Sequence, residues 1–299
     1  MLHQRTQPGP GIIALMVMLC AVWGFQQIAV KIAMLGISPI LQGGLRSAIA
    51  TTLLVAWAYW RGLPLWQRDA SLRPGVIAGL MFSLEFISIY FGLNYTNASR
   101  MVVFLYTAPC FTVLGLHWWV ASERLSLRQW IGVGLAFVGI ALAFADGWGH
   151  AGHWFGDLCG LAAAIFWSAT TVLIRTTSLA GISAAKVLFY QLVISAVVML
   201  PLSVLVGEAG LTAVTPAVLL ALTYQALIVA FVSYLAWFWL LTRYLANRLV
   251  VFSFLTPLFG VVFGVLLLDE RLTVTFGLAA LMVVAGIVLV NASGQKTSN

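Results

Sequence analysis

The sequence predicts an all-helical integral membrane protein with ten transmembrane helices, arranged as two inverted five-helix repeats. Of its 299 residues, 62% are hydrophobic and only 8% are charged. A soluble domain could not bury that much apolar surface. Runs of roughly 20 apolar residues, enough to cross a hydrocarbon layer about 30 Å thick, follow one another along most of the chain. The chain also contains an internal duplication, which predicts the two repeats.

The apolar runs predict ten spans, separated by short connections that carry Pro, Gly or charged residues. The first run continues past roughly 20 residues without a small-residue cleavage site, so we expect a retained helix rather than a signal peptide. In order along the chain, the spans cover residues 11–33, 39–60, 74–94, 100–121, 128–146, 156–175, 183–206, 216–241, 248–268 and 273–291.

The duplication is clearest in one twelve-residue stretch. ASRMVVFLYTAP, residues 98–109, returns as ANRLVVFSFLTP, residues 246–257, with six identical positions. Each copy begins near an arginine and ends at a proline inside an apolar run. The prolines, Pro109 and Pro257, lie about nine residues from the arginines, which corresponds to a depth near the bilayer centre.

The similarity continues beyond these stretches. The triplet ERL opens an apolar segment at residues 123–144 and again at residues 270–291, and Trp23 and Trp167 each precede a basic residue by eight positions. The chain therefore consists of two copies of a five-span unit. Because five is odd, the second copy enters the membrane from the opposite side, and such inverted repeats recur in secondary transporters.

The basic residues predict the orientation, because cytoplasmic flanks are enriched in Lys and Arg. With the N-terminus inside, eleven of the 15 basic residues fall on the cytoplasmic side. The four on the other side are Lys31, Arg46, Arg100 and Arg271. We therefore expect cytoplasmic tails at residues 1–10 and 292–299, repeats at 11–146 and 156–291, and an external linker at 147–155.

The order of several short motifs resembles the drug/metabolite transporter superfamily, in its ten-helix form with two EamA-like halves. Besides the Pro-containing stretches and the ERL triplets, the motifs are AVWGFQQIAVK (residues 21–31), LQGGLRSAIA (residues 41–50) and GLNYTNAS (residues 92–99). The resemblance covers almost the whole chain. It implies export of small metabolites across a bacterial inner membrane, and the most similar branch exports aromatic and other neutral amino acids.

Other function classes lack their sequence signatures. No lysine follows a glycine, which excludes a P-loop, and neither HExxH nor GxSxG occurs. The net charge of +7 is not gathered into a basic surface outside the membrane, so nucleic-acid binding is not indicated. We expect no enzymatic activity, no cofactor and no resident metal. The expected partners are a small-molecule substrate and the lipid bilayer, with the chain working as a monomer.

Glu85 is the one acidic residue predicted well inside a span, where a charge is costly and usually faces a cavity or a partner. On a helix it shares a face with Met81, Ser88 and Gly92. One interpretation is that Glu85 contacts a substrate ammonium group or carries a coupling proton. The other is a structural carboxyl, neutral or paired with Arg46 or Lys31.

Aromatic and polar residues predict the rest of a substrate site, because rings stack on apolar side chains and attract ammonium groups. Packing or anchoring at the membrane interface is the competing explanation for each ring. Trp23 and Trp167 are repeat-related and are followed by polar residues. The predicted substrate-binding residues are Trp23, Gln26, Glu85, Ser88, Tyr90, Tyr106, Trp167, Thr170, Tyr234 and Trp237.

Arg46 and the two prolines complete the predictions. Arg46 begins the second span and could bind a substrate carboxylate, but we expect it to extend to the interface. Pro109 and Pro257 each remove a helical N–H donor, which predicts a hinge in each half beside a central cavity. The sequence thus predicts an amino-acid exporter that works by alternating access. The alternatives are a carrier of cationic drugs, other small metabolites or nucleotide sugars, and a channel or receptor-like protein.

Overall fold

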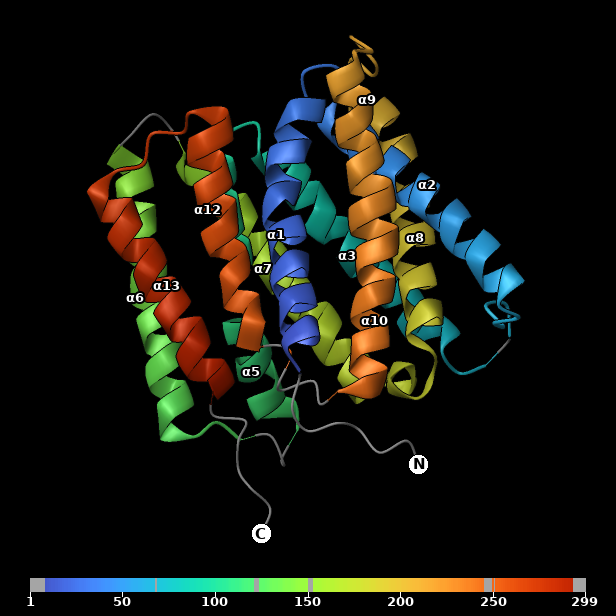
Figure 1. Cartoon of the computed structure of the whole chain (residues 1–299), viewed down its shortest axis with the longest axis horizontal. Coiled ribbons are helices and arrows are strands. Elements are labelled where there is room, and N and C mark those ends of the chain that lie inside the picture. The colour runs from blue at the N-terminus through green and yellow to red at the C-terminus, as the bar shows by residue number, and fades with distance from the viewer. Residues whose placement is uncertain are drawn as a thin grey trace.

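A computed structural model describes residues 9–67, 69–120, 124–149, 153–244, 249 and 251–292 (Figure 1). Its helices are α1 (Pro10–Ala33), α2 (Pro39–Trp60), α3 (Leu72–Gly92), α4 (Ala98–Leu105), α5 (Ala108–Trp119), α6 (Leu127–Gly149), α7 (Trp154–Thr176), α8 (Ala184–Leu205), α9 (Pro216–Thr223), α10 (Tyr234–Arg243), α12 (Leu255–Leu268) and α13 (Val274–Ala292).

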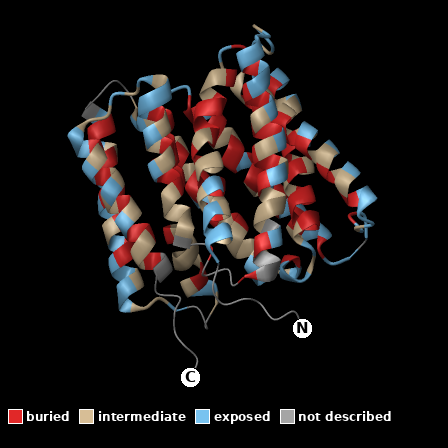
Figure 2. Cartoon of the chain, viewed as in Figure 1, coloured by how far each residue is buried: buried red, intermediate tan, exposed pale blue. Residues whose placement is uncertain are grey.

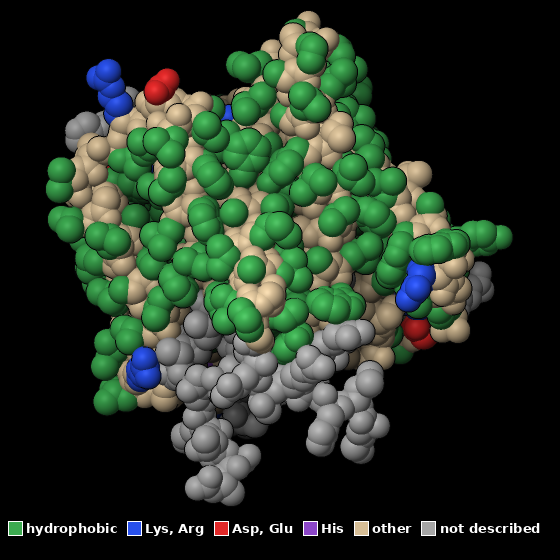
Figure 3. Space-filling model, viewed as in Figure 1, with side chains coloured by type: hydrophobic (Ala, Val, Ile, Leu, Met, Phe, Trp, Pro, Cys, Tyr) green, Lys and Arg blue, Asp and Glu red, His purple; other side chains and the backbone are tan. Residues whose placement is uncertain are grey.

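The all-helical, ten-span prediction is confirmed. Within the described ranges, 8 helical stretches are long and apolar enough to cross a membrane, and two shorter apolar helices, Phe252–Leu268 and Val274–Val290, complete the set. Charged side chains lie along the margins of the face in Figure 3, and hydrophobic side chains cover the area between them. This apolar band fits a lipid environment.

Helices from the two repeats pack against each other throughout the bundle. The main pairs are α2 with α8, α3 with α7, α1 with α12, and α6 with α13. Gly132 and Gly286 allow α6 and α13 to approach closely, because a Cβ on Gly132 would lie 2.8 Å from the Gly286 carbonyl oxygen. Buried residues gather where the helices face one another (Figure 2). The core therefore lies between the repeats.

Two spans depart from regular α-helix in their interior. The predicted span 100–121 is broken into α4 and α5 by a turn at Tyr106 and Thr107. Between α9 and α10 the chain forms a π-helix, Tyr224–Ser233. Such wide turns are rare and often occur at functional sites. Both departures lie inside predicted transmembrane spans, 100–121 and 216–241.

Candidate functional site

A buried arginine lies at the centre of the polar residues between the repeats. Pro39 begins α2, and Arg46 follows about two turns later on the face that packs inward. Its side chain is enclosed, at 0% exposure, with the guanidinium carbon 4.1 Å from the centroid of the Phe86 ring. Nη2 donates a long 3.5 Å hydrogen bond to the Tyr234 hydroxyl. The expectation that Arg46 extends to the interface is wrong, because α3 and α10 cover it.

Glu85 lies on α3 beside this arginine and is buried at 7% exposure. The two side chains interact electrostatically, but no guanidinium nitrogen of Arg46 lies within 4.0 Å of a carboxyl oxygen of Glu85. Tyr106 and Tyr234 also lie close enough to interact with the Glu85 charge. Arg46 and Glu85 are thus a buried basic and a buried acidic group that interact without an ion pair between them.

Hydrogen bonds close the bundle on the side of this core toward the start of α2. The Tyr90 hydroxyl donates to Gln225 Oε1 at 2.6 Å, and Gln225 Nε2 donates to the carbonyl oxygen of Ala29 at 3.3 Å. Gln42 Nε2 donates to the carbonyl oxygen of Val30 at 3.2 Å. These bonds connect α1 and α3 to the second repeat through the π-helix, and α2 to α1.

Several buried polar atoms of α1 and α2 have no hydrogen-bond partner. In the described part of the chain, these atoms include Arg46 Nε, Arg46 Nη1, Gln27 Oε1 and Gln42 Oε1. Buried polar groups are nearly always hydrogen-bonded, so each exception needs an explanation. The atoms without a partner are thus hydrogen-bond donors of a cationic side chain and acceptors of neutral amide side chains.

The predicted aromatic residues form two contacts near this core. The rings of Tyr106 and Trp167 meet edge to face with centroids 5.3 Å apart. Trp23 and Trp237 do the same at 5.8 Å, and Trp23 Nε1 donates to the Ser233 hydroxyl at 2.9 Å. Since Ser233 precedes Tyr234, the second contact is linked to the surroundings of Arg46.

Three other predicted site residues make no side-chain hydrogen bond to the polar and aromatic residues described above. The hydroxyls of Ser88 and Thr170 donate to carbonyl oxygens of their own helices, those of Leu84 and Phe166. Gln26 is buried on α1. Their roles in substrate binding stay predictions, as do those of the other predicted site residues.

Each repeat-related proline lies in the first turn of a helix. Pro109 is the second residue of α5, directly after the break at Tyr106 and Thr107. Pro257 is the third residue of α12, which follows a 3₁₀ turn, Val251–Phe254. The missing N–H of proline is tolerated in a first turn. Both positions are irregular, and their function as hinges stays a prediction.

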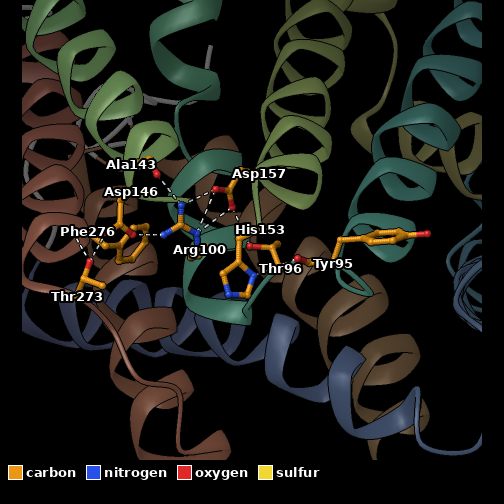
Figure 4. Close-up of polar contacts among 9 residues, drawn as sticks. All are labelled: Tyr95, Thr96, Arg100, Ala143, Asp146, His153, Asp157, Thr273 and Phe276. Atoms are coloured by element: carbon orange, nitrogen blue, oxygen red, sulfur yellow. Dashed lines mark hydrogen bonds and ion pairs between the residues drawn. The ribbon is translucent and has the colours of Figure 1, made fainter. Parts of the chain in front are cut away.

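A second buried arginine, Arg100, is held by two aspartates (Figure 4). Its Nε lies 3.0 Å from Asp157 Oδ1, and its Nη1 lies 2.7 Å from Asp146 Oδ2. Nη2 donates to Asp157 and to the carbonyl oxygen of Ala143. Thr273 of the second repeat donates to Asp146 at 2.6 Å. Every guanidinium nitrogen is satisfied, so this cluster fastens α4, α6, α7 and α13 together.

Two glutamates cap helix N-termini across the repeats. Glu208, between α8 and α9, accepts from the backbone N–H groups of Ile40 and Leu41 at 2.8 and 2.9 Å. Glu270, between α12 and α13, accepts from Ala98 and Ser99 at 2.7 and 2.9 Å. A carboxylate is favourable at the positive end of a helix dipole. These caps bind the first repeat to loops of the second.

Two hollows are found in the described part of the chain, and neither corresponds to the predicted central cavity. One hollow of about 540 Å³ opens outward between α2 and α8 and is lined mainly by apolar residues such as Val55 and Phe189. A smaller one lies beside Arg124. The central cavity therefore stays a prediction.

Sequence reasoning missed most of the polar partners in the core. Gln42 and Gln225 are not among the predicted site residues, because an amide in an apolar run carries little signal by itself. A spacing of one helical turn separates Gln42 from Arg46, and that spacing could have identified a polar face on α2.

Comparisons with known proteins agree with this architecture. The profile of the EamA-like transporter family matches residues 10–145 and again 154–292. A probable amino-acid metabolite efflux pump of Escherichia coli is 27% identical, with 93% of each chain covered. An uncharacterized transporter of Archaeoglobus fulgidus is 24% identical, covering 92% of this chain and 95% of the relative. A solved crystal structure has the same fold, with a TM-score of 0.65 at 17% identity over 92% of this chain and 94% of the other. Because the family profile matches both halves, the chain belongs to the EamA-like transporter family.

Proposed function

We propose that this protein exports amino acids, aromatic or otherwise neutral ones, across the bacterial inner membrane as a monomeric secondary transporter. The observation that carries the proposal is the presence of one basic and one acidic side chain, Arg46 and Glu85, buried close to each other between the repeats. A neutral amino acid also carries one charge of each sign. A binding region with one acid and one base can therefore match both ends of it.

The rings around this pair support an aromatic or other apolar side chain. Tyr106, which interacts with Glu85, meets the ring of Trp167. Trp23 meets the ring of Trp237 and donates to Ser233, the residue before Tyr234. Contacts of this kind contribute about 0.5 to 1.5 kcal/mol each beyond area burial. The efflux pump of Escherichia coli, by its printed name, acts on amino-acid metabolites, which agrees with this substrate class.

The other transport substrates fit the charges less well. A cationic drug would be attracted by Glu85 but repelled by Arg46, which lies in the same region. A nucleotide sugar carries several negative charges, and Arg46 is the one cation there that the described residues supply. Amino acids are the class that both charges favour.

Transport in proteoliposomes tests the proposal. We expect saturable uptake of labelled phenylalanine, tyrosine or leucine, accelerated when unlabelled amino acid is present on the opposite side. A channel would instead pass unrelated solutes without saturation, and a receptor-like protein would give no flux. Either result would contradict the proposal.

Replacement of Glu85 by Gln tests the acidic end of the site. We expect at least about a tenfold loss of uptake, because a charge-assisted contact contributes about 1.5 to 3 kcal/mol. Asp269→Asn is the matched control, since it makes the same carboxyl-to-amide change at an exposed position. Unchanged uptake and pH dependence in Glu85→Gln would assign this carboxyl a structural role.

A further inference from the structure

We infer that Arg46 is the carboxylate-binding residue of this transporter and that the amide oxygens of Gln27 and Gln42 bind the substrate ammonium group together with Glu85. The inference rests on the proposed function and names the atoms that would recognise a zwitterion. The evidence is the unused hydrogen-bonding capacity of these three buried side chains.

Arg46 retains the donors that carboxylate binding needs. Nε and Nη1 make no hydrogen bond to any described residue, and Nη2 makes only the 3.5 Å contact with Tyr234. Nη2 can pair with either Nε or Nη1 to present two parallel N–H groups. A carboxylate matches such a pair in a bidentate arrangement, which gives both strength and orientation.

No acidic side chain of the described chain forms an ion pair with Arg46. Glu85 stays outside ion-pair distance. Asp146 and Asp157 bind Arg100, Asp69 binds Lys186, and Glu208 and Glu270 cap helices. A buried charge without a partner is strongly unfavourable. A ligand carboxylate would remove this penalty.

Arg100 provides an internal comparison. It is as deeply buried, at 3% exposure against 0% for Arg46, yet its nitrogens all bind carboxylate or carbonyl oxygens. The same protein therefore holds one arginine with a complete set of partners and one without. The difference points to a ligand at Arg46 rather than to a general feature of buried arginines in this fold.

The two glutamines supply the acceptors for the opposite end of the substrate. Gln42 lies one helical turn from Arg46, and its Nε2 is anchored on the Val30 carbonyl oxygen, so the orientation of its amide is held. Its Oε1 and that of Gln27 are buried and unused. An ammonium group carries three N–H donors. Neutral amide oxygens bind it without adding a second negative charge beside Glu85.

A ligand series on purified protein in nanodiscs tests the inference. The probes are L-phenylalanine, L-phenylalaninamide, which lacks the carboxylate, and 3-phenylpropionate, which lacks the ammonium group. Affinity is read from thermal stabilisation and intrinsic tryptophan fluorescence. In the wild type we expect the amide to bind about tenfold to a hundredfold more weakly than phenylalanine, because it loses charge-assisted hydrogen bonds.

The variant Arg46→Gln is expected to lose this preference and bind phenylalanine and its amide with similar, weak affinity. Arg46→Lys should recover part of the preference, since it restores the charge without the bidentate geometry. Gln42→Leu should weaken phenylalanine but leave 3-phenylpropionate unchanged. Arg73→Gln is the matched control, because it makes the same change at an exposed arginine.

The outcomes separate the two proposals. Equal wild-type affinity for phenylalanine and its amide, or a preference that survives in Arg46→Gln, would overturn the Arg46 site; the wild-type comparison needs no variant to fold. Binding of 3-phenylpropionate without amino-acid flux would overturn the proposed function and support a carboxylate site at Arg46. If no carboxylate in the series binds the wild type, the inference is wrong.

Discussion

Arg46 and Arg100 are both enclosed in the bundle, but their neighbours assign them different tasks. Arg100 binds two aspartates and a carbonyl oxygen and packs over the Phe276 ring at 4.6 Å. Arg46 packs over Phe86 and leaves donors unused. At the residue scale, hydrogen-bond satisfaction therefore distinguishes a structural cation from one available to a ligand, although burial is nearly the same.

Removal of the Arg100 charge should destabilise the protein. Arg100→Gln would leave Asp146 and Asp157 buried without a cation, and loss of one member of a buried ion pair costs about 3 to 5 kcal/mol. We expect a clear drop in the thermal unfolding temperature in detergent. The triple variant that also carries Asp146→Asn and Asp157→Asn should recover much of the loss, and Arg46→Gln should be far milder. Equal destabilisation by the two arginine variants would contradict this distinction.

Asp69, in the connection before α3, is charged at every physiological pH. The hydrogen bond from Lys186, followed by those from Ser71, lowers the pKa of its carboxyl to about 2. Because the pKa of this carboxyl is lower in the folded than in the unfolded protein, its ionisation stabilises the fold at any pH above about 4, the pKa in the unfolded chain. This stabilisation is lost as the pH falls toward 2. We therefore expect Asp69→Asn to leave the shape of the transport pH profile unchanged between about pH 5 and 8. A shifted profile would show that Asp69 titrates in that range.

Polar contacts at the helix ends hold the α2–α8 pair at both ends, whereas the corresponding cap on α4 holds one end only. Glu208 caps α2 at its first turn, and Asp69 binds Lys186 in the first turn of α8. Because α2 and α8 run in opposite directions, their packed pair is fastened at both faces of the bundle. Glu270 holds only the N-terminal end of α4. We expect movement during transport to involve α4 more than the α2–α8 pair.

Amide hydrogen exchange can test the Glu270 cap directly. Glu270→Ala should raise exchange at Ala98 and Ser99 about fivefold, since loss of a cap costs about 1 kcal/mol. Exchange at Ile40 and Leu41 should stay unchanged, because Glu208 still caps them. Glu208→Ala should give the reverse pattern. Faster exchange at both helix ends in either single variant would indicate general loosening instead of a local cap.

The proline positions give a second test at the scale of elements. In the double variant Pro109→Ala, Pro257→Ala, the backbone N–H groups return and the irregular stretches before α5 and α12 can become continuous helix. We expect slower transport with little change in substrate affinity, measured as flux and binding on the same preparation. Full transport by the double variant would rule out the prolines as hinges.

At the scale of the whole molecule, burial changes how the basic residues bear on orientation. Arg46 and Arg100, two of the four basic residues predicted outside, are enclosed and not in contact with the aqueous phase. Lys31 interacts with Glu270. Lys186, on the predicted cytoplasmic side, is enclosed as well. Among the described residues, burial thus removes two basic residues from the predicted outside and one from the predicted inside. The start of α1 and the end of α13 lie at the same side of the bundle, as an even number of crossings requires (Figure 1).

Cysteine labelling would establish which side is cytoplasmic. In a background without the three native cysteines, Thr212→Cys in the connection before α9 should react with a membrane-impermeant maleimide in intact cells. Gln67→Cys, in the connection before α3, should react only after permeabilisation. Both positions are exposed, so access to the reagent and not burial decides the result. The opposite pattern would reverse the predicted orientation.

Much of the fold could be predicted because it depends on local composition. Apolar runs set the spans, and the repeated stretch with Pro109 and Pro257 identified the duplication. The candidate site was predicted only in part. Glu85, Tyr106, Trp167 and Tyr234 were expected and do meet through ring contacts or electrostatic interaction. The environment of Arg46 was not foreseen, because snorkelling and burial give the same sequence pattern.

The sequence by itself determined the membrane class, the number of spans and the inverted duplication, since hydropathy and internal similarity depend on the order of residues alone. Only the tertiary structure decided which polar groups are satisfied. Arg100 meets Asp146 and Asp157 from α6 and α7, whereas Arg46 meets Phe86 and Tyr234. These partners come from helices distant in the chain, and their contacts exist only once the helices pack.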